Sequence, residues 1–314
     1  MDTLSHTLIG IAVAGLSGQP ATVNDPVYIA TLLGAQAPDF DIIALLRGNL
    51  AYLKQHRAFS HSFPGLALWS ALITIAIHLF MPQSSLLTVF SWAYIGGISH
   101  IGIDYFNTHG AAILWPFRAD RKSVQLLNVF DPILLSLMLL LYAGDFTPVG
   151  LASATLATII VYIGLRLYLR QQATKWLTAN FAAHTVSRIT VMPALKRLFF
   201  WDFVLETDVR YFIGQISAFY PLVEIHASLP KATEVSSLTV EAQKTPLGDF
   251  FSRFTPFIYY EEQLDVDLLK VNIYDLRYII NQQFLHQATI IFNERNIPAI
   301  SYMHSHGRKF NVPC

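Results

Sequence analysis

Long runs of apolar residues dominate the first half of the chain. Four of them approach the roughly 20 residues that an α-helix needs to cross a bilayer, and they cover residues 63–80, 86–103, 126–143 and 149–165. Two shorter runs, residues 4–16 and 28–37, are joined by a polar turn. The pattern predicts four membrane-spanning helices preceded by a short tilted or re-entrant hairpin.

Two of the expected helices carry start signals. Ser62 can cap a helix that begins at residue 63, with Pro64 tolerated in its first turn. Asp131 stands directly before Pro132 in the same arrangement. We expect Asp131 to be an N-cap, and a contribution to a metal site is the alternative.

After residue 176 the pattern changes from long apolar runs to alternation of apolar and polar residues. Residues 201–213 and 288–292 are enriched in β-branched and aromatic side chains, which favours strands. We therefore expect a mostly α-helical protein. Residues 1–176 would form a polytopic membrane bundle, and residues 177–314 would form a smaller cytoplasmic domain of α+β or β-rich type.

The composition supports a membrane location. Hydrophobic residues make up 53% of the chain and charged residues only 13%, against about 25% charged residues in soluble domains. The formal net charge is zero, which gives no support for a nucleic-acid partner. The one cysteine is Cys314, so no intrachain disulfide can form. The N-terminus lacks the features of a secretory signal, and we expect the mature protein to begin at Met1.

Basic residues are grouped between alternate apolar runs, and these groups predict the orientation. Residues 81–85 and 144–148 contain no lysine or arginine. The basic groups flank the other ends of the runs and comprise Arg47, Lys54, Arg57, Arg118, Arg121, Lys122, Arg166, Arg170 and Lys175. By the positive-inside rule these ends face the cytoplasm of a bacterial inner membrane.

His100 and Asp104 lie at one of the predicted cytoplasmic ends. They are four residues apart, so on a helix they share one face and can both ligate one metal ion. The alternative is a buried histidine hydrogen-bonded to an aspartate one turn away. Ionisable groups in membrane segments are expensive to bury and are usually functional, which favours the metal site.

Two further clusters near the N-terminus carry the same chemistry. Asp39 and Asp41 follow Pro38, which predicts an extended or turn conformation there. Their carboxylates would repel each other without a cation nearby, although a solvated turn that caps a helix at residues 42–46 is the alternative. His56 and His61 are five residues apart, which favours a loop that folds over the site.

Arg57 and His6 complete the candidate residues. Arg57 offers a forked donor suited to a phosphate group, and an interfacial arginine that sets the topology is the alternative. His6 lies one turn into the first apolar run, where a polar interruption satisfied by Asp2 or Thr3 is the alternative. Imidazole and carboxylate ligands without thiolates indicate a divalent metal, with zinc first and manganese or iron as alternatives.

Taken in order, these motifs resemble the bacterial inner-membrane metal-dependent hydrolases, also described as LexA-binding, inner-membrane-associated hydrolases. The matching segments are Met1-Asp2-Thr3-Leu4-Ser5-His6, Pro38-Asp39-Phe40-Asp41, His56-Arg57 with Ser60-His61-Ser62, and His100 with Asp104-Tyr105-Phe106-Asn107-Thr108-His109-Gly110. That family is placed near zinc-dependent phospholipase C and single-strand nucleases. The resemblance implies a helical metal site that cleaves phosphoester bonds.

We therefore expect a membrane-bound hydrolase with its site at the cytoplasmic face and a lipid or small-molecule phosphoester as substrate. The predicted metal ligands are His6, Asp39, His56, His61, His100 and Asp104. Arg57 would steady the phosphate, and Asp41 would act as base or bridging ligand. Two other classes remain open: a membrane metal carrier or sensor, and an adaptor that binds a cytoplasmic protein through residues 177–314.

Overall fold

The computed structural model describes residues 1–48, 57–108, 110–118, 121–231, 235–265, 268–305, 308–312 and 314. The chain divides into two compact units, Met1–Tyr168 and Leu169–Cys314. A long helix, α7 (Pro148–Asn180), contains the junction between them and also the predicted boundary after residue 176.

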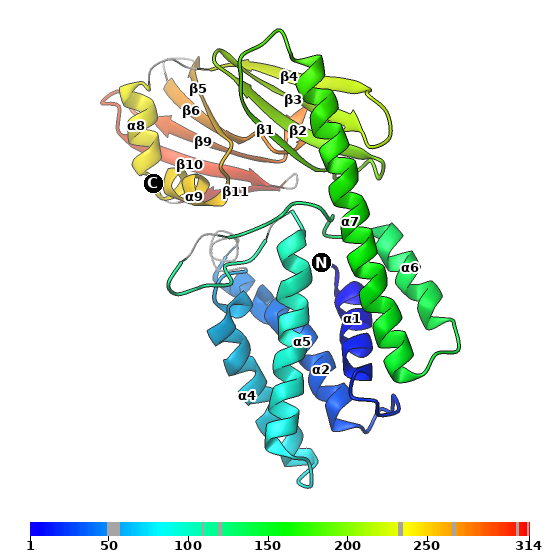
Figure 1. The fold of residues 1–314 in the computed structure, drawn as a ribbon. Helices are drawn as coiled ribbons and strands as arrows, with labels where there is room; N and C mark the ends of the chain where they lie inside the picture. The colour runs from blue at the N-terminus through cyan, green and yellow to red at the C-terminus, as the bar shows by residue number, and fades with distance from the viewer. Residues whose placement is uncertain are drawn as a thin grey trace. The chain divides into compact units, whose positions relative to one another are not determined.

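The first unit is helical. Together with the first part of α7 it contains α1 (Thr3–Gly15), α2 (Pro26–Gln36), the 3₁₀ segments η1 (Ala37–Arg47) and η2 (Phe59–His61), α4 (Phe63–Phe80), α5 (Leu86–Phe106) and α6 (Pro132–Tyr142) (Figure 1). Polar side chains cap the helix starts as the sequence predicts. Ser62 Oγ accepts a hydrogen bond from the Gly65 amide at the start of α4, and Asp131 caps α6 before Pro132.

Three helices, α4, α5 and α7, are long and apolar enough to cross a membrane. Between 22% and 39% of the residues in their apolar stretches are buried in the protein. The remaining apolar side chains need another covering, which a bilayer supplies.

The fourth predicted span is not confirmed, because α6 has only 11 residues. An 11-residue helix is about 16 Å long, far short of the bilayer core of about 30 Å. The apolar residues before it are used differently. Leu126 and Leu127 are buried in an extended segment whose amides donate to the Phe106 carbonyl at the end of α5.

The segment after Pro38 also differs from the prediction. Asp39 and Asp41 lie in η1, a 3₁₀ helix that continues directly from α2, where the sequence predicts an extended or turn conformation. Ala37 keeps a right-handed helical conformation although a proline follows it, and its amide donates to the Leu33 carbonyl. Ala37 is 1% exposed, so packing outweighs the local preference of a residue before proline.

The expected N-terminal hairpin forms from α1 and α2, and α2 packs closely against α5. Gly34 and Gly96 make this approach possible: a Cβ at Gly34 would collide with the Ala93 carbonyl, and one at Gly96 with the Thr31 carbonyl. Small residues at helix crossings allow such close approach in membrane proteins. The contact brings the end of α2 beside His100 of α5.

The second unit is rich in strands, so the protein is a mixed structure and the prediction of a mostly α-helical fold is only partly correct. One antiparallel sheet has the order β1-β2-β3-β4, a second has the order β11-β10-β9-β6-β5, and β7 pairs with β8. The strands are β1 (Val186–Pro193), β2 (Phe200–Thr207), β3 (Arg210–Ser217), β4 (Val223–Pro230), β5 (Ile258–Asp265), β6 (Leu268–Asp275), β7 (Ile279–Ile280), β8 (Gln283–Phe284), β9 (His286–Phe292), β10 (Pro298–Ser305) and β11 (Arg308–Val312). Two short helices, α8 (Ser237–Lys244) and α9 (Pro246–Phe254), complete the unit.

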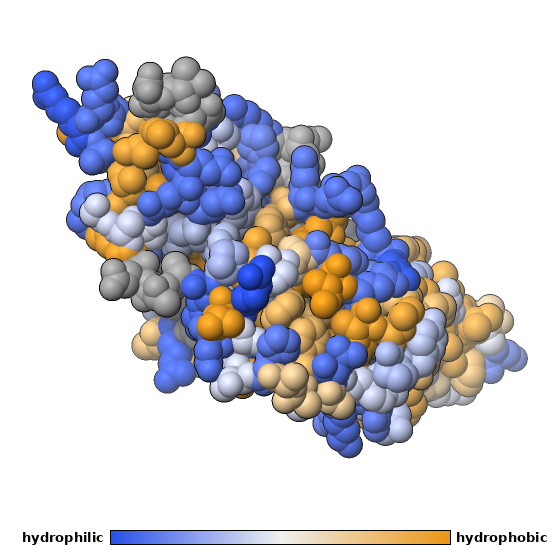
Figure 2. Space-filling view, turned by 90° about the horizontal axis from the view of Figure 1, so that it is seen from above, coloured by the Kyte–Doolittle hydropathy of each residue, from blue (hydrophilic) through white to orange (hydrophobic). Residues whose placement is uncertain are grey.

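The strand predictions are confirmed where the sequence is most regular. Residues 201–213 form most of the hairpin of β2 and β3, and residues 288–292 lie within β9. A core cluster contains Met192, Val204 and Ile213 of the first sheet, and Tyr259 of β5 and Tyr274 of β6 in the second sheet pack against it. On the face drawn in Figure 2, hydrophobic residues form separate patches among hydrophilic ones.

Candidate metal centre

Four segments of the helical unit bring imidazoles and carboxylates together. His6 comes from α1, Asp39 from η1, His61 from η2, and His100 and Asp104 from α5. Both His100 and Asp104 are fully buried, as their four-residue spacing on one helix face predicts. Asp39 is the most accessible of the five, with 27% of its side chain exposed.

The distances between the ligand atoms fit the coordination sphere of a small metal ion. His61 Nε2 and His100 Nε2 are 3.2 Å apart, and each lies 3.6 Å from Asp39 Oδ1. Asp104 Oδ2 lies 3.7 Å from His61 Nε2 and 3.8 Å from His100 Nε2. Ligands bound at about 2.0–2.2 Å to a tetrahedral zinc ion stand about 3.3–3.6 Å apart. These five distances lie within a few tenths of an ångström of the separation between the ligands of a tetrahedral zinc ion.

His6 adds a second observation that points to a cation. Its ring stacks on His100 with the centroids 3.7 Å apart, and the side chain is 1% exposed. Within the described residues, neither ring nitrogen makes a hydrogen bond of good geometry, and Nε2 lies 3.4 Å from Asp104 Oδ1. Buried polar groups rarely lack a hydrogen-bond partner. The ligand atoms of His6, Asp39 and His100 lie within 4.8 Å of one another, and a metal ion bound there would give the His6 ring a partner.

Hydrogen bonds on the far side of each ring fix two of the histidines. His100 Nδ1 lies 2.7 Å from the Ala35 carbonyl at the end of α2. His61 Nδ1 lies 2.9 Å from Ser60 Oγ, whose hydroxyl is 2.8 Å from Asp41 Oδ2. Metal-ligating histidines are commonly oriented in this way by a carbonyl or carboxylate on the second ring nitrogen. The two Nε2 atoms are thus turned toward each other, 3.2 Å apart.

Asp41 lies behind His61, on the opposite side from Asp39. Its Oδ2 is 3.6 Å from His61 Nδ1 and accepts a hydrogen bond of 2.9 Å from the Arg57 amide. Asp39 Oδ1 instead faces His61 Nε2. The two carboxylates that the sequence places one residue apart therefore occupy different positions around one ring.

Arg57 supports Asp104 from within the protein. Its guanidinium is buried, with Nη2 3.1 Å from Asp104 Oδ2 and Nη1 3.0 Å from Asn107 Oδ1. Asn107 in turn donates to Asp104 Oδ1 over 2.8 Å. The Met1 amino group also contacts Asp104 Oδ1. Positive charge and donors thus surround this carboxylate and compensate for its burial.

The charge state of Asp39 suits metal binding. Burial works to raise the pKa of Asp39, but the His61 hydrogen bond and the neighbouring imidazoles outweigh it and hold the pKa well below its usual range. The side chain is therefore an anion at neutral pH. It is also the ligand that solvent reaches most easily.

The structure brings together five of the six predicted ligands: His6, Asp39, His61, His100 and Asp104. The remaining predicted ligand, His56, lies outside the described residues. The sequence did not single out the supporting groups Ser60, Asn107 and the Ala35 carbonyl. Ser60 and Asn107 lie inside the motifs around His61 and Asp104, and that proximity is the only signal they carry. The Ala35 carbonyl carries none.

The fold and this cluster define a membrane protein whose helical unit holds a candidate metal centre. The chain belongs to the YdjM inner membrane protein family, which matches residues 1–173 and so includes every residue of the cluster. It is also similar to the Bacillus subtilis (strain 168) protein called "Uncharacterized protein YfhP", with 29% identity over 288 residues, 88% of this chain and 87% of that protein. No solved structure matches the chain.

Proposed function

We propose that this protein is a metal-dependent hydrolase of the inner membrane that cleaves phosphoester bonds. The observation that carries the proposal is that the Nε2 atoms of His61 and His100 lie 3.2 Å apart and each lies 3.6–3.8 Å from a carboxylate oxygen of Asp39 and of Asp104, which are distances typical of ligands of one metal ion. The unsatisfied ring of His6 beside them supports it. The residues present therefore fit a divalent ion, and zinc fits their chemistry best.

A divalent ion bound there supplies Lewis-acid polarisation of a phosphoryl oxygen and an activated water. The protein's own groups hold and orient the site. The Ala35 carbonyl and Ser60 fix the rings of His100 and His61, and Arg57 with Asn107 holds Asp104 in place. Asp39 lies at the accessible side, where a substrate can approach.

Two roles remain predictions. Asp41 as a base is a prediction, and its contacts through Ser60 to His61 also support an orienting role. Arg57 as a phosphate contact is a prediction as well, and its bonds to Asp104 and Asn107 support a positioning role.

The test combines metal analysis with an assay. The full chain is purified in detergent, its metals are measured, and hydrolysis of bis(p-nitrophenyl) phosphate is followed before and after chelation. We expect at least about one equivalent of zinc per chain. Chelation of the metal should abolish the hydrolysis, and added zinc should restore it. His61→Ala should lose both, whereas His226→Ala, which alters a histidine of β4 in the other unit, should keep both. Metal binding without hydrolysis would favour a carrier or sensor.

We also propose that α4 and α5 cross the membrane with the centre near the cytoplasmic side. The support is that residues 81–85 between these two apolar helices contain no lysine or arginine, whereas basic residues such as Arg57 and Arg118 lie beyond their other ends. In a chain with Cys314→Ser, a cysteine placed at Ser84, between α4 and α5, should react with an impermeant maleimide in whole cells. A cysteine at Lys122 should react only after permeabilisation. The reverse pattern would contradict the orientation.

A further inference from the structure

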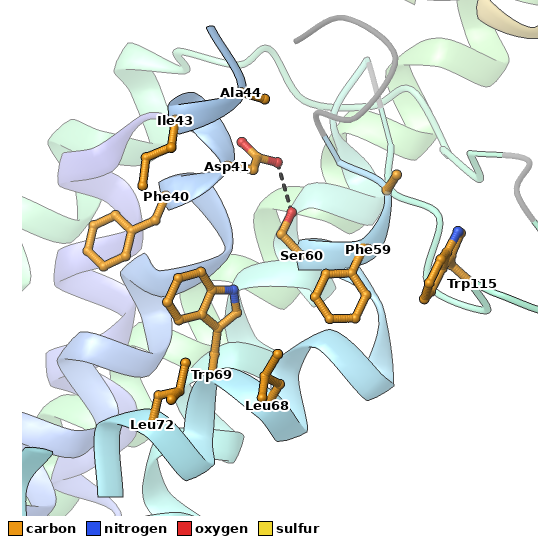
Figure 3. A pocket seen from close by; sticks show the side chains of 11 residues that line it. Phe40, Asp41, Ile43, Ala44, Phe59, Ser60, Leu68, Trp69, Leu72 and Trp115 are labelled. Carbon is orange, nitrogen blue, oxygen red and sulfur yellow. Dashed lines mark hydrogen bonds between the residues drawn. The ribbon is translucent and has the colours of Figure 1, made fainter. Parts of the chain in front are cut away.

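An apolar cavity of about 580 Å³ lies between η1 and α4 in the helical unit (Figure 3). Phe40 and Ile43 of η1 form one wall, and Leu68, Trp69 and Leu72 of α4 form another. Its volume falls within the range of about 300–1,000 Å³ that small-molecule sites occupy. The lining is mostly carbon, so the cavity suits an apolar group.

The polar side chains Asp41 and Ser60 connect this cavity to the centre. Both line it, and the hydrogen bond between them is drawn in Figure 3. Ser60 Oγ is also 2.9 Å from His61 Nδ1, so only one residue separates the cavity from a metal ligand. An apolar group bound in the cavity would therefore place whatever is attached to it near the centre.

The cavity is also continuous with a lipid-facing surface of α4. Leu68 and Leu72 of the cavity wall are followed along the same helix face by Ile75 and Leu79, at spacings of three and four residues. All four side chains are between 49% and 73% exposed. Since α4 is one of the helices that can cross a membrane, this stripe leads from the bilayer interior to the cavity.

We infer that the cavity holds the acyl or alkyl chain of an amphiphilic phosphoester, which enters from the bilayer along the Leu68–Leu79 face of α4. This inference rests on the proposed function and names its substrate class. The apolar walls bind the chain and disfavour insertion of a charged head group, because a charge buried among apolar side chains is costly. The head group then stays on the side of the cavity that adjoins the centre.

The first test compares two diesters with the same reacting group, methyl p-nitrophenyl phosphate and dodecyl p-nitrophenyl phosphate. Hydrolysis breaks the bond from phosphorus to p-nitrophenolate, forms a new phosphorus–oxygen bond from water, and releases a proton to solvent. The full metal-loaded chain is reconstituted in nanodiscs, and the ratio of kcat/KM for the dodecyl diester to that for the methyl diester is measured.

Two tryptophan variants make the comparison specific. Leu68→Trp fills the cavity, and we expect it to lower the ratio about tenfold or more through a lower kcat/KM for the dodecyl diester. Leu87→Trp adds the same side chain at an exposed leucine of α5, outside the cavity and outside the Leu68–Leu79 face, and it should leave the ratio unchanged. Partition of the dodecyl diester into the bilayer is the same for every variant, so it cancels when the ratios of two variants are compared. An unchanged ratio in Leu68→Trp, with the methyl diester still cleaved, overturns the inference but leaves the proposed function intact.

A binding measurement separates the inference from catalysis. A dodecyl phosphate with a diazirine on its chain is photolysed with the full chain, and the labelled residues are mapped. We expect saturable labelling around Trp69 that excess dodecyl phosphate prevents and methyl phosphate does not. Such labelling without hydrolysis of either diester would support the cavity and contradict the hydrolase. Non-saturable labelling that is equal at Leu68 and Leu79 would show that the probe reaches the protein only as a lipid of the bilayer, and this result would overturn the inference.

Discussion

The two units of the protein each bury an aspartate, and their surroundings differ sharply. Asp104 of α5 contacts the guanidinium of Arg57, the amino group of Met1 and the imidazole of His6. Asp202 of β2 is 8% exposed and accepts a hydrogen bond from the neutral amide of Gln215 over 2.8 Å. One carboxylate is surrounded by cationic groups and donors, and the other has little compensation for the loss of water.

The difference shows what each unit does with a buried charge. Burial raises the pKa of Asp202 to about 7, and the Gln215 hydrogen bond opposes this only in part. In the helical unit, several cationic groups and hydrogen-bond donors instead hold Asp104 in place as an anion, which is the form that binds a metal. This arrangement supports a functional role for Asp104. The following substitutions test the difference between Asp104 and Asp202.

The largest effect is expected from Asp104→Asn. It removes a charged ligand and leaves the buried Arg57 without its carboxylate, which typically costs about 3–5 kcal/mol. We expect the zinc content to fall to background and the unfolding temperature to drop. Asp202→Asn should leave the zinc content unchanged. The zinc content of both variants is measured by elemental analysis, and an equal loss of zinc in the two would contradict the difference between Asp104 and Asp202.

A pH series on Asp202 comes next. The pKa of Asp202 rises from 3.8 to about 7 on folding, so between these values the folded chain holds a proton that the unfolded chain releases. The stability contributed by this proton is therefore full below about pH 4, falls as the pH rises from 4, and is lost once the pH passes 7. At pH 8 we expect Asp202→Asn to be more stable than the natural chain by up to about 4 kcal/mol. Equal melting curves at pH 5 and pH 8 for both chains would refute this.

A glycine pair tests the packing that supports the metal centre. Gly96→Ala would push α2 away from α5, and we expect a loss of about 1–3 kcal/mol in stability and weaker metal binding, because the Ala35 carbonyl would leave His100. Gly102→Ala, on the same helix but with open space around the new methyl group, should gain a few tenths of a kcal/mol to about 1 kcal/mol. Equal stability losses in the two variants would contradict the packing argument.

The smallest effect concerns Ser60. Ser60→Ala removes the link between Asp41 and the His61 ring, and loss of such a group commonly weakens metal binding about 10- to 100-fold. A competition titration with a chelator measures this change. Ser99→Ala removes a hydroxyl that bonds only within α5, to the Gly96 carbonyl, and is the matched control. Unchanged affinity in Ser60→Ala would show that His61 needs no such support.

The sequence alone predicted most residues of the candidate metal centre and much of the architecture. Runs of apolar residues predicted α4, α5 and the start of α7, because a helix in lipid needs an uninterrupted apolar surface. The four-residue spacing of His100 and Asp104 predicted a shared helix face. Alternation of apolar and polar residues predicted β2, β3 and β9.

Tertiary structure decided how the remaining segments are used. Leu126 and Leu127 could have extended a helix, but they lie in an extended segment whose amides bond to the Phe106 carbonyl at the end of α5. Pro38 could have ended the helical path, but the burial of Ala37 keeps the path helical and places Asp39 and Asp41 on different sides of His61. Groups such as the Ala35 carbonyl gain their role only when α2 and α5 meet. Hydrophobic pattern is a local property that the sequence displays, whereas the meeting of distant polar groups depends on packing between helices, which no local pattern records.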